Sequence, residues 1–322
     1  MITNTGFDEM RDVMAYLDQV PFDVSRKSLY CAEELYDGFN AFDESTYDNC
    51  FDSRIYQRYK QYGQHARIVK ELLARTLHDH CIHTALARFL HEHDHRRCVG
   101  VLGGHALLRT DKMFLEIALL SKRLTEEGFV MITGGGPGAM EATHLGAWMA
   151  GRNNSDLDEA LQMLSVSPSF KDARWLCSAF SVIDKYPLQN QFVSLGVPTW
   201  LYGHEPSTPF ATHIAKFFEN SLREDNILTL AFGGTIYAPG SAGTLQEIFQ
   251  EAVQDHYLSY GFASPMIFLG KRFWSDEIPV YPLLKSLMQT GKYKNLLLSL
   301  TDDIDEIVTT LQQFSQQENV LQ

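Results

Sequence analysis

The sequence predicts an α/β fold in which a doubly wound, mostly parallel sheet carries helices on both faces and follows a mainly helical N-terminal extension. Two observations predict it. From about Cys98 onward, short apolar runs alternate with stretches whose apolar residues recur at helical spacing, an order typical of a parallel sheet with crossover helices. Residues 1–95 lack this alternation, are rich in Asp, Tyr and Phe, and show mostly helical patterns.

The first half of the alternating region is expected to run strand, helix, strand, helix. Arg97–Leu102 is a short apolar run that ends in a pair of glycines, as a buried strand and its turn would. Asp111–Glu127 then has apolar residues at helical spacing. Phe129–Thr133 is a second buried strand that ends in a glycine cluster, and Met140–Ala150 is expected to be a helix of small residues.

The second half is expected to continue this pattern after a segment of mixed signals at 165–191. Short apolar runs predict four more strands, at Val197–Tyr202, Thr235–Ala238, Pro265–Leu269 and Leu296–Leu300. Helical spacing predicts five more helices, at Leu157–Leu164, Phe210–Arg223, Ala242–His256, Tyr281–Met288 and Asp303–Phe314.

We therefore expect two parts, an extension at residues 1–95 and a sheet domain at residues 96–322. The length of 322 residues allows two domains, or one large domain with an extension. Within the extension, Ile68–Leu77 and Thr84–Leu90 have helical patterns, and we expect them to pack as a helical cap. Six histidines crowd residues 78–95, but His91, His93 and His95 alternate with acidic residues as a solvated stretch would, so no metal site is expected.

Composition excludes several classes of protein. Hydrophobic residues make up 45% and charged residues 21%, which is typical of a globular chain. The 27 Lys and Arg against 40 Asp and Glu give a net charge of −13, and no local basic patch stands out, so a nucleic-acid binder is not expected. A small anionic ligand stays possible, because one helix terminus or one arginine can hold it.

The sequence also favours a cytoplasmic protein. No apolar run approaches the roughly 20 residues that a membrane span requires. Met1–Val20 has no apolar core segment and is not expected to be a signal or transit peptide. The five cysteines are scattered and form no C-x-x-C pair, which suits a reducing compartment.

The first glycine cluster stands at a predicted junction of strand and helix. Ile132–Glu141 holds four glycines, namely Gly134, Gly135, Gly136 and Gly138. Glycines there allow positive φ and a close approach of a ligand to the main chain, and the helix terminus favours an anion. A tight turn without a ligand is the alternative. The segment is neither the G-x-G-x-x-G fingerprint, because positions 139 and 141 are Ala and Glu, nor a Walker A loop.

A second cluster, in Tyr237–Glu247, again joins a predicted strand to a helix. It contains Gly240, Ser241, Gly243 and Thr244. Two such turns in one sheet can face each other at the carboxyl ends of the strands, where open α/β sheets bind ligands. Ser241 is not in a nucleophile elbow, because G-x-S-x-G would need glycine where Pro239 stands.

Together the two clusters resemble the paired signatures G-G-G-x-x-G-x-M and P-G-G-x-G-T-x-x-E of the LOG (Lonely Guy) family, nucleoside 5′-monophosphate phosphoribohydrolases long labelled lysine decarboxylases. The matching stretches are Gly134–Met140 and Pro239–Glu247, and the similarity covers about residues 97–315. The resemblance implies a Rossmann-like fold, hydrolysis of the N-glycosidic bond to give free base and ribose 5-phosphate, no cofactor or metal, and at least a homodimer.

The resemblance also implies roles for residues. Glu247 would be the catalytic carboxylate, assisted by Arg223, which stands one residue further from the motif's proline than is usual. The phosphate and nucleotide would be held by Gly240, Ser241, Gly243 and Thr244 on one wall, and by Gly103, Gly104, Gly134, Gly135, Gly136, Gly138 and Met140 on the other. Ser241 stands where the family usually has glycine, and Glu224 where it has lysine.

Alternatives to this enzyme stay open at this point. A nucleotide-binding sensor or carrier would use the same cleft without turnover, and a scaffold would carry a vestigial site. Phe210 and His213 are possible contacts to the base. A pyridoxal-phosphate decarboxylase needs a buried Schiff-base lysine, and we expect polar, surface or loop surroundings for the candidate lysines Lys112, Lys122, Lys216 and Lys271.

Overall fold

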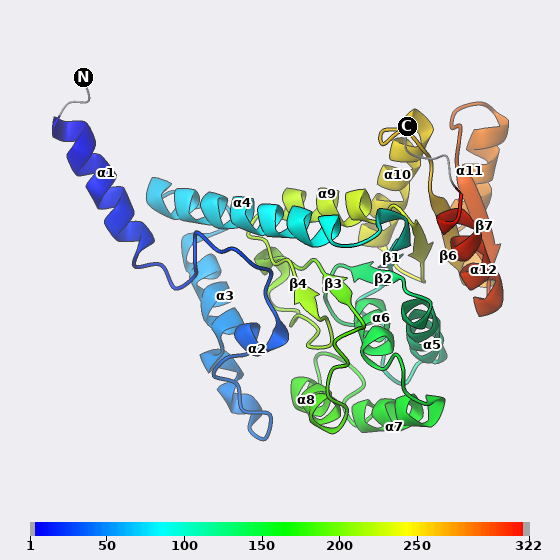
Figure 1. Ribbon diagram of the computed structural model, residues 1–322, viewed down its shortest axis with the longest axis horizontal. Helices are drawn as coiled ribbons and strands as arrows, with labels where there is room; N and C mark the ends of the chain where they lie inside the picture. The colour runs from blue at the N-terminus through cyan, green and yellow to red at the C-terminus, as the bar shows by residue number, and fades with distance from the viewer. Residues whose placement is uncertain (1–3, 318–322) are drawn as a thin grey trace.

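The computed structural model describes residues 4–317, so the chain ends at 1–3 and 318–322 lie outside the described part, including the outer limits of both predicted domains. Seven parallel strands form one sheet in the order β4-β3-β2-β1-β5-β6-β7 (Figure 1). Helices pack around this sheet. The predicted fold class, a doubly wound α/β sheet, is confirmed.

The strands are short and mostly buried, as expected for a parallel sheet covered on both faces. They are β1 Cys98–Leu102, β2 Val130–Thr133, β3 Ser194–Gly196, β4 His213–Ile214, β5 Gly234–Tyr237, β6 Pro265–Leu269 and β7 Leu297–Thr301.

The α-helices of the described residues are α1 Asn4–Leu17, α2 Ala32–Leu35, α3 Phe51–Tyr62, α4 Val69–His91, α5 Lys112–Glu126, α6 Ala139–Trp148, α7 Asn154–Leu164, α8 Trp175–Lys185, α9 Asn220–Leu230, α10 Ala242–Tyr257, α11 Val280–Gln289 and α12 Ile304–Ser315. Short 3₁₀ turns lie at η1 Glu44–Asn49, η2 His95–Arg97 and η3 Trp200–Tyr202, and η4 Phe273–Glu277 is a π-helical turn.

Alternation along the strands builds two cores, one on each face of the sheet. Val99 and Val101 of β1 belong to the core with α5, α6 and α12. Cys98 and Leu102 of the same strand belong to the other core, which includes buried residues of α4, α9, α10 and α11. Successive side chains of a strand point to opposite faces, so both faces of β1 are covered by helices.

The order of the strands determines where the sheet can form a crevice for a ligand. After β1 the chain adds β2, β3 and β4 on one side, then crosses back to place β5, β6 and β7 on the other. The carboxyl ends of β1 and β5 therefore lie at the point where the order reverses, which is where open parallel sheets form a crevice.

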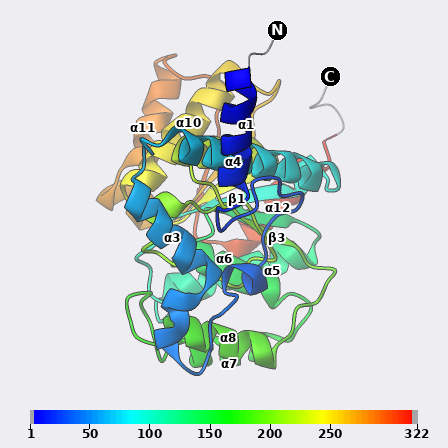
Figure 2. The same ribbon diagram turned by 90° about the vertical axis from the view of Figure 1, so that its left-hand side faces the viewer.

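The N-terminal segment packs against the sheet domain. In Figures 1 and 2, α4 runs across the molecule above strands β1 and β3. The carboxylate of Asp79 in α4 accepts hydrogen bonds from the backbone N–H groups of Phe218 and Glu219, immediately before α9. Buried residues of α3 and α4 share one core with the strands. The predicted helices at Ile68–Leu77 and Thr84–Leu90 are parts of the single helix α4.

Two predictions between residues 194 and 223 are wrong. Val197–Tyr202 is not a strand, because β3 ends at Gly196 and a 3₁₀ turn follows. Phe210–Arg223 is not one helix, because it contains the short strand β4 and the helix begins only at Asn220. Pairing with β3 and a side-chain bond from Thr212 to the carbonyl of Ser194 hold this stretch extended, which overrides its local helical spacing.

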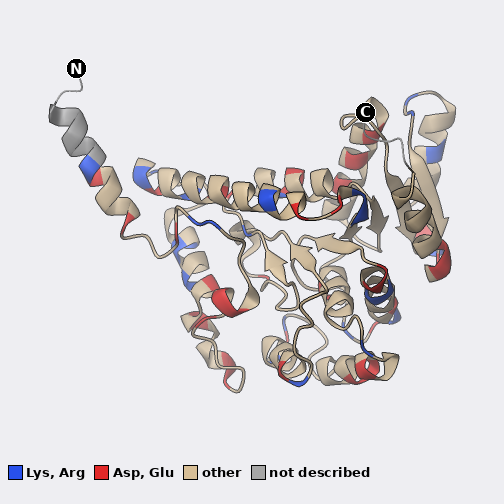
Figure 3. Ribbon diagram, in the orientation of Figure 1, with Lys and Arg blue, Asp and Glu red and all other residues tan. Residues whose placement is uncertain are grey.

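Figure 3 shows Lys and Arg interspersed with Asp and Glu over the helices. Among the described residues, no helix is both long enough and apolar enough to cross a membrane.

Candidate functional site

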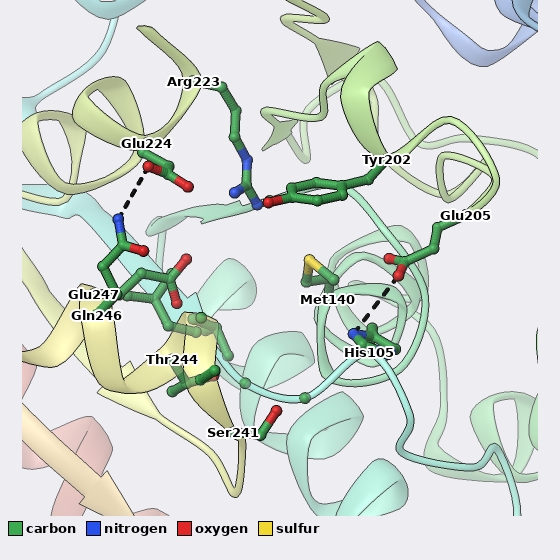
Figure 4. A pocket seen from close by; sticks show the side chains of 17 residues that line it. His105, Met140, Tyr202, Glu205, Arg223, Glu224, Ser241, Thr244, Gln246 and Glu247 are labelled. Atoms are coloured by element: carbon green, nitrogen blue, oxygen red, sulfur yellow. Dashed lines mark hydrogen bonds and ion pairs between the residues drawn. The ribbon is translucent and has the colours of Figure 1, made fainter. Parts of the chain in front are cut away.

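A cleft of about 430 Å³ opens at the carboxyl ends of β1, β2 and β5 (Figure 4). Most of the residues predicted for the site line it, although they come from distant parts of the sequence. The lining consists of Val101, Leu102, Gly103, Gly104, His105, Gly134, Met140, Tyr202, Glu205, Arg223, Glu224, Ser241, Ala242, Gly243, Thr244, Gln246 and Glu247.

The floor of the cleft is the turn after β1. The backbone of Gly104 bonds to both neighbouring turns, donating to the carbonyl of Pro239 at 3.0 Å and accepting from the amide of Ala139 at 3.2 Å. A Cβ added at Gly103 would lie 2.8 Å from the Cβ of Ala139 and 2.9 Å from that of Ala238. Only glycine allows the three turns to approach this closely.

The first glycine cluster divides into a lining residue and supporting residues. Gly134 lines the cleft beside Met140. Gly138 begins α6 with φ of +69°, and a Cβ there would overlap the carbonyl oxygen of Gly104. Gly135, Gly136 and Gly138 are not part of the lining. They shape the turn behind it.

The second cluster opens the N-terminus of α10 into the cleft. Ser241, Ala242 and Gly243 are exposed there. Ser241 is the N-cap residue, but its side chain makes no capping hydrogen bond to the first turn of the helix. The first N–H groups of a helix have no partner inside the helix and point toward an anion. Gly240 lies behind this turn, where a Cβ would overlap Thr244. The geometry suits a phosphate group.

Glu247 stands on α10, one turn beyond this opening, and its carboxylate points into the cleft (Figure 4). Burial raises the pKa of Glu247 from 4.5 to about 7; the positive charge of Arg223 opposes this rise, and the negative charge of Glu224 adds to it. A carboxyl with a pKa near neutrality can hold or release a proton at neutral pH, which is the property of a general acid or base.

Arg223 reaches the cleft from the first turn of α9. Its Nε donates to the carbonyl oxygen of Val197 at 3.1 Å, which leaves the rest of the guanidinium facing the cleft. Figure 4 shows the side chains of Arg223 and Tyr202 both pointing into the cleft. The neighbouring Glu224 accepts a hydrogen bond from Gln246 at 3.0 Å, so α9 and α10 are joined at the rim of the cleft.

Sequence reasoning missed four polar residues of the lining: His105, Tyr202, Glu205 and Gln246. Nδ1 of His105 lies 3.7 Å from a carboxylate oxygen of Glu205, which links the turn after β1 to the loop after η3. Of these four, only His105 had a sequence signal, because it follows the paired glycines after β1. Tyr202 and Glu205 reach the cleft through the loop whose conformation was predicted wrongly.

The structure places the two possible base contacts outside the cleft. Phe210 is fully buried and packs edge to face against Trp148 at a ring distance of 6.2 Å. His213 lies on β4, with its ring 4.9 Å from that of Phe89. Neither residue is part of the cleft lining.

Lys216 is more deeply buried than the sequence predicts for the candidate lysines, although its partners are polar. It is 1% exposed and forms an ion pair with Asp52 of α3 at 2.7 Å. Its Nζ also donates to Oγ of Ser207 at 3.0 Å. Lys122 is 6% exposed and pairs with Glu126. Neither lysine lines the cleft.

Among the histidines at 78–95, His78 and His93 pack against other side chains, whereas His80, His83 and His91 are exposed. His78 is fully buried, and its ring nitrogens bond to the hydroxyl of Tyr30 at 2.8 Å and to Asp79 at 3.0 Å. The ring of His93 stacks on that of Phe89. Within residues 4–317 there is no cluster of His, Cys, Asp and Glu that could hold a metal ion.

Comparisons with known proteins found no matching family model and no matching curated protein. Similar solved structures include a structural-genomics target designated TM1055, which is 18% identical with a TM-score of 0.44. The molybdenum cofactor binding protein of the phototrophic bacterium Rippkaea orientalis is 14% identical with a TM-score of 0.41. The Moco carrier protein of Chlamydomonas rheinhardtii is 16% identical with a TM-score of 0.41. Each likeness covers 67% of this chain and 95–98% of the other chain.

Proposed function

We propose that the protein hydrolyses the N-glycosidic bond of a nucleoside 5′-monophosphate and releases the free base and ribose 5-phosphate. One observation carries this proposal. A partly buried carboxyl with a pKa of about 7, that of Glu247, lies one helical turn from an open helix N-terminus and shares its cleft with Arg223. The resemblance of the two glycine clusters to the LOG signatures supports the same reaction.

The phosphate would bind at the start of α10. The backbone N–H groups of Gly243 and Thr244 lie in the first turn of this helix, and the hydroxyls of Ser241 and Thr244 can add further hydrogen bonds. The phosphate is remote from the bond that breaks, so the free energy of binding the phosphate can be used to orient the ribose for attack.

Glu247 would then act on the ribose. As the bond between C1′ and the base nitrogen lengthens, positive charge develops on the sugar ring, and an ionised carboxylate beside it is stabilising. The same carboxylate accepts a proton from the attacking water, whose oxygen forms the new bond to C1′. The electron pair of the broken bond leaves with the base, which takes up a proton. Arg223 would orient the carboxylate or the phosphate.

The other two carboxylates of the cleft fit a sugar. Glu205 and Glu224 can accept hydrogen bonds from ribose hydroxyls, because an ionised carboxylate is an acceptor only. Hydrogen bonds to the sugar that strengthen in the transition state supply part of the catalysis in glycoside hydrolysis.

The test is to incubate the protein with a panel of purine and pyrimidine 5′-monophosphates and to measure the released base by chromatography. We expect release by the wild type and a loss of about 10²-fold or more for Glu247→Gln, the range for removal of a general base. Glu251→Gln is the matched control, because Glu251 is a carboxylate one turn further along α10 and outside the cleft lining. No release from any nucleotide would refute the hydrolase.

A carrier or sensor that binds the nucleotide without turnover is the second candidate, and one observation favours it. Glu224 lines the cleft where the LOG signature has a lysine, which adds a negative charge near the bound phosphate. Stabilisation of the wild type and of Glu247→Gln by a nucleotide, without release of base from either, would support the carrier. The expected homodimer and cytoplasmic location are further proposals, and light scattering of the purified protein tests the dimer.

A further inference from the structure

We infer that a second cavity, between the N-terminal segment and the sheet domain, binds a planar, amino-substituted nitrogen heterocycle, the chemical class of a free nucleobase. This cavity has a volume of about 270 Å³ and is lined by none of the residues that line the catalytic cleft. Cavities at the boundary of two structural parts are preferred places for small ligands. The volume suits one ring system of one or two fused rings.

Aromatic side chains from both parts of the chain line the cavity. Tyr47 of η1 and Tyr56 of α3 come from the N-terminal segment, whereas Phe170 and Trp175 come from the sheet domain. Lys60 places its ammonium group 4.6 Å from the centre of the Tyr56 ring, and Lys171 places its own 5.7 Å from that of Phe170. The ammonium groups over these two rings lie at the ends of flexible lysine side chains, so a planar heterocycle would stack on the rings by displacing them.

The polar side chains of the cavity supply both halves of a hydrogen-bonding pattern. Glu44 and Asp48 are acceptors, whereas Lys60 is a donor and His204 offers a ring nitrogen of either kind. An amino-substituted heterocycle presents donors on its exocyclic amino and ring N–H groups and acceptors on its ring nitrogens. A purely apolar ligand or a simple anion would leave part of this set unused.

One loop separates the second cavity from the catalytic cleft. Tyr202 and Glu205 face the cleft, and Gly203, His204 and Pro206 face the second cavity. Gly203 lies against the Tyr56 ring so closely that an added Cβ would overlap it. The ring of Phe170 lies 6.0 Å from that of His105 in the cleft. A base released in the cleft could thus be held beside it, but the cavity is assigned from its own side chains and does not depend on the proposed hydrolysis.

Calorimetric titration of the full chain with adenine, and separately with cytosine, tests this assignment. We expect one of the two bases to bind the wild type. Removing one stacking ring, in Tyr56→Ala or Phe170→Ala, should weaken binding at least about fivefold. Phe42→Ala is the matched control, because Phe42 is an aromatic residue near η1 that is 93% exposed and outside the cavity. It should bind like the wild type.

Glu247→Gln separates this inference from the proposed hydrolysis. It should bind the base like the wild type, whether or not the wild type releases base from nucleotides. Absence of binding by either base would overturn the assignment. Binding that is unchanged in both Tyr56→Ala and Phe170→Ala, or that a nucleoside monophosphate abolishes competitively, would place the base in the catalytic cleft and would also overturn it. Two variants, one from each part of the chain, guard against one that fails to fold.

Discussion

Glu247 owes its raised pKa to its surroundings on α10. Burial disfavours the ionised form, Arg223 favours it, and Glu224 disfavours it. A pKa of about 7 means that Glu247 is ionised in roughly half of the free molecules at neutral pH. A general base must be ionised, so its reaction should depend on pH across this range.

For the free enzyme, kcat/KM should therefore rise with pH and level off above an apparent pKa near 7. Glu224→Gln removes the neighbouring negative charge, so it should shift this rise to lower pH. Arg223→Gln removes the positive charge and should shift it to higher pH. Rate profiles of the three proteins against pH check the directions, and shifts of the same sign in both variants would contradict this account.

Two glycines of the first cluster should respond differently to alanine. At Gly134 an added Cβ would overlap the guanidinium of Arg223, which is the end of a long side chain and can move. Gly134→Ala should keep its melting temperature but weaken nucleotide binding. At Gly138 the φ of +69° and the carbonyl of Gly104 leave no such freedom, so Gly138→Ala should lose stability by roughly 1–3 kcal/mol. Thermal melts and calorimetry distinguish the two outcomes.

At the scale of elements, α10 carries two further buried carboxyls. Burial raises the pKa of Glu251 to about 7 and that of Asp255 to about 8. Ser264 donates to one oxygen of each, at 2.9 and 3.1 Å. The second oxygen of each has no hydrogen-bond partner within the described residues. The helix is thus best accommodated when these two groups are protonated.

Stability should consequently fall as pH rises. Both carboxyls have a higher pKa in the folded than in the unfolded chain, so the folded state binds more protons between about pH 4 and pH 8, and the associated stability is lost as pH rises through this window. Between pH 6 and pH 8.5, which covers the upper part of this window, the loss should be on the order of 4 kcal/mol. Urea unfolding at pH 6 and pH 8.5 measures it. The variant with both Glu251→Gln and Asp255→Asn should show a much smaller difference, and an equal difference in both proteins would refute the assignment.

The helix that carries Arg223 depends on α4. Asp79 is buried and accepts hydrogen bonds from the amides of Phe218 and Glu219 at 2.8–3.1 Å, which places its charge at the start of α9. A carboxylate at a helix N-terminus is favoured both by these bonds and by the helix dipole. Helix α4 therefore orients the helix that delivers the cleft's arginine.

Asp79→Ala should leave these two amides unpaired, lower stability by roughly 1–3 kcal/mol, and weaken nucleotide binding. Hydrogen exchange should increase at residues 218–224. Asp303→Ala is the matched control, because Asp303 accepts the amide of Asp305 at the start of α12 and lies outside the cleft lining. It should lower stability but leave nucleotide affinity unchanged. Equal loss of affinity in the two variants would argue against a positioning role for Asp79.

At the scale of the whole molecule, a buried polar cluster joins the N-terminal segment to the sheet domain. Asp52 of α3 accepts from Nε1 of Trp200 and from Nζ of Lys216, both at 2.8 Å. All three side chains are buried. A buried charge that loses its partner is strongly destabilising, whereas an exposed pair contributes little.

We therefore expect Asp52→Ala to cost about 3–5 kcal/mol of unfolding free energy. Replacing both partners, in Asp52→Leu with Lys216→Met, should recover much of this loss. Glu116→Ala is the control for an ordinary ion pair, because its partner Lys112 is 87% exposed, and it should cost less than about 1 kcal/mol. Guanidinium unfolding of the four proteins measures these differences, and a small effect of Asp52→Ala would contradict the role of the cluster.

Three features could be predicted from the amino-acid sequence alone: the parallel α/β class, the two glycine turns at junctions of strand and helix, and the position of Glu247 on the helix after the second turn. These features are local. The spacing of apolar residues decides between strand and helix, and glycine permits tight turns and close approach wherever it stands. For the same reason the strands at 97–102 and 265–269 and the helix at 242–256 agree with the structure within about a residue.

Three other features could not be predicted without the folded structure: the course of residues 194–223, the burial of Lys216 and the pKa of Glu247. Each depends on partners distant in the sequence: β3 beside Thr212, Asp52 beside Lys216, and Arg223 and Glu224 beside Glu247. The loop that carries Tyr202 and Glu205 into the cleft depends on such partners too, because it packs against Tyr56 of α3. Pairing and burial between distant segments outweigh local preference, and local patterns contain no record of them.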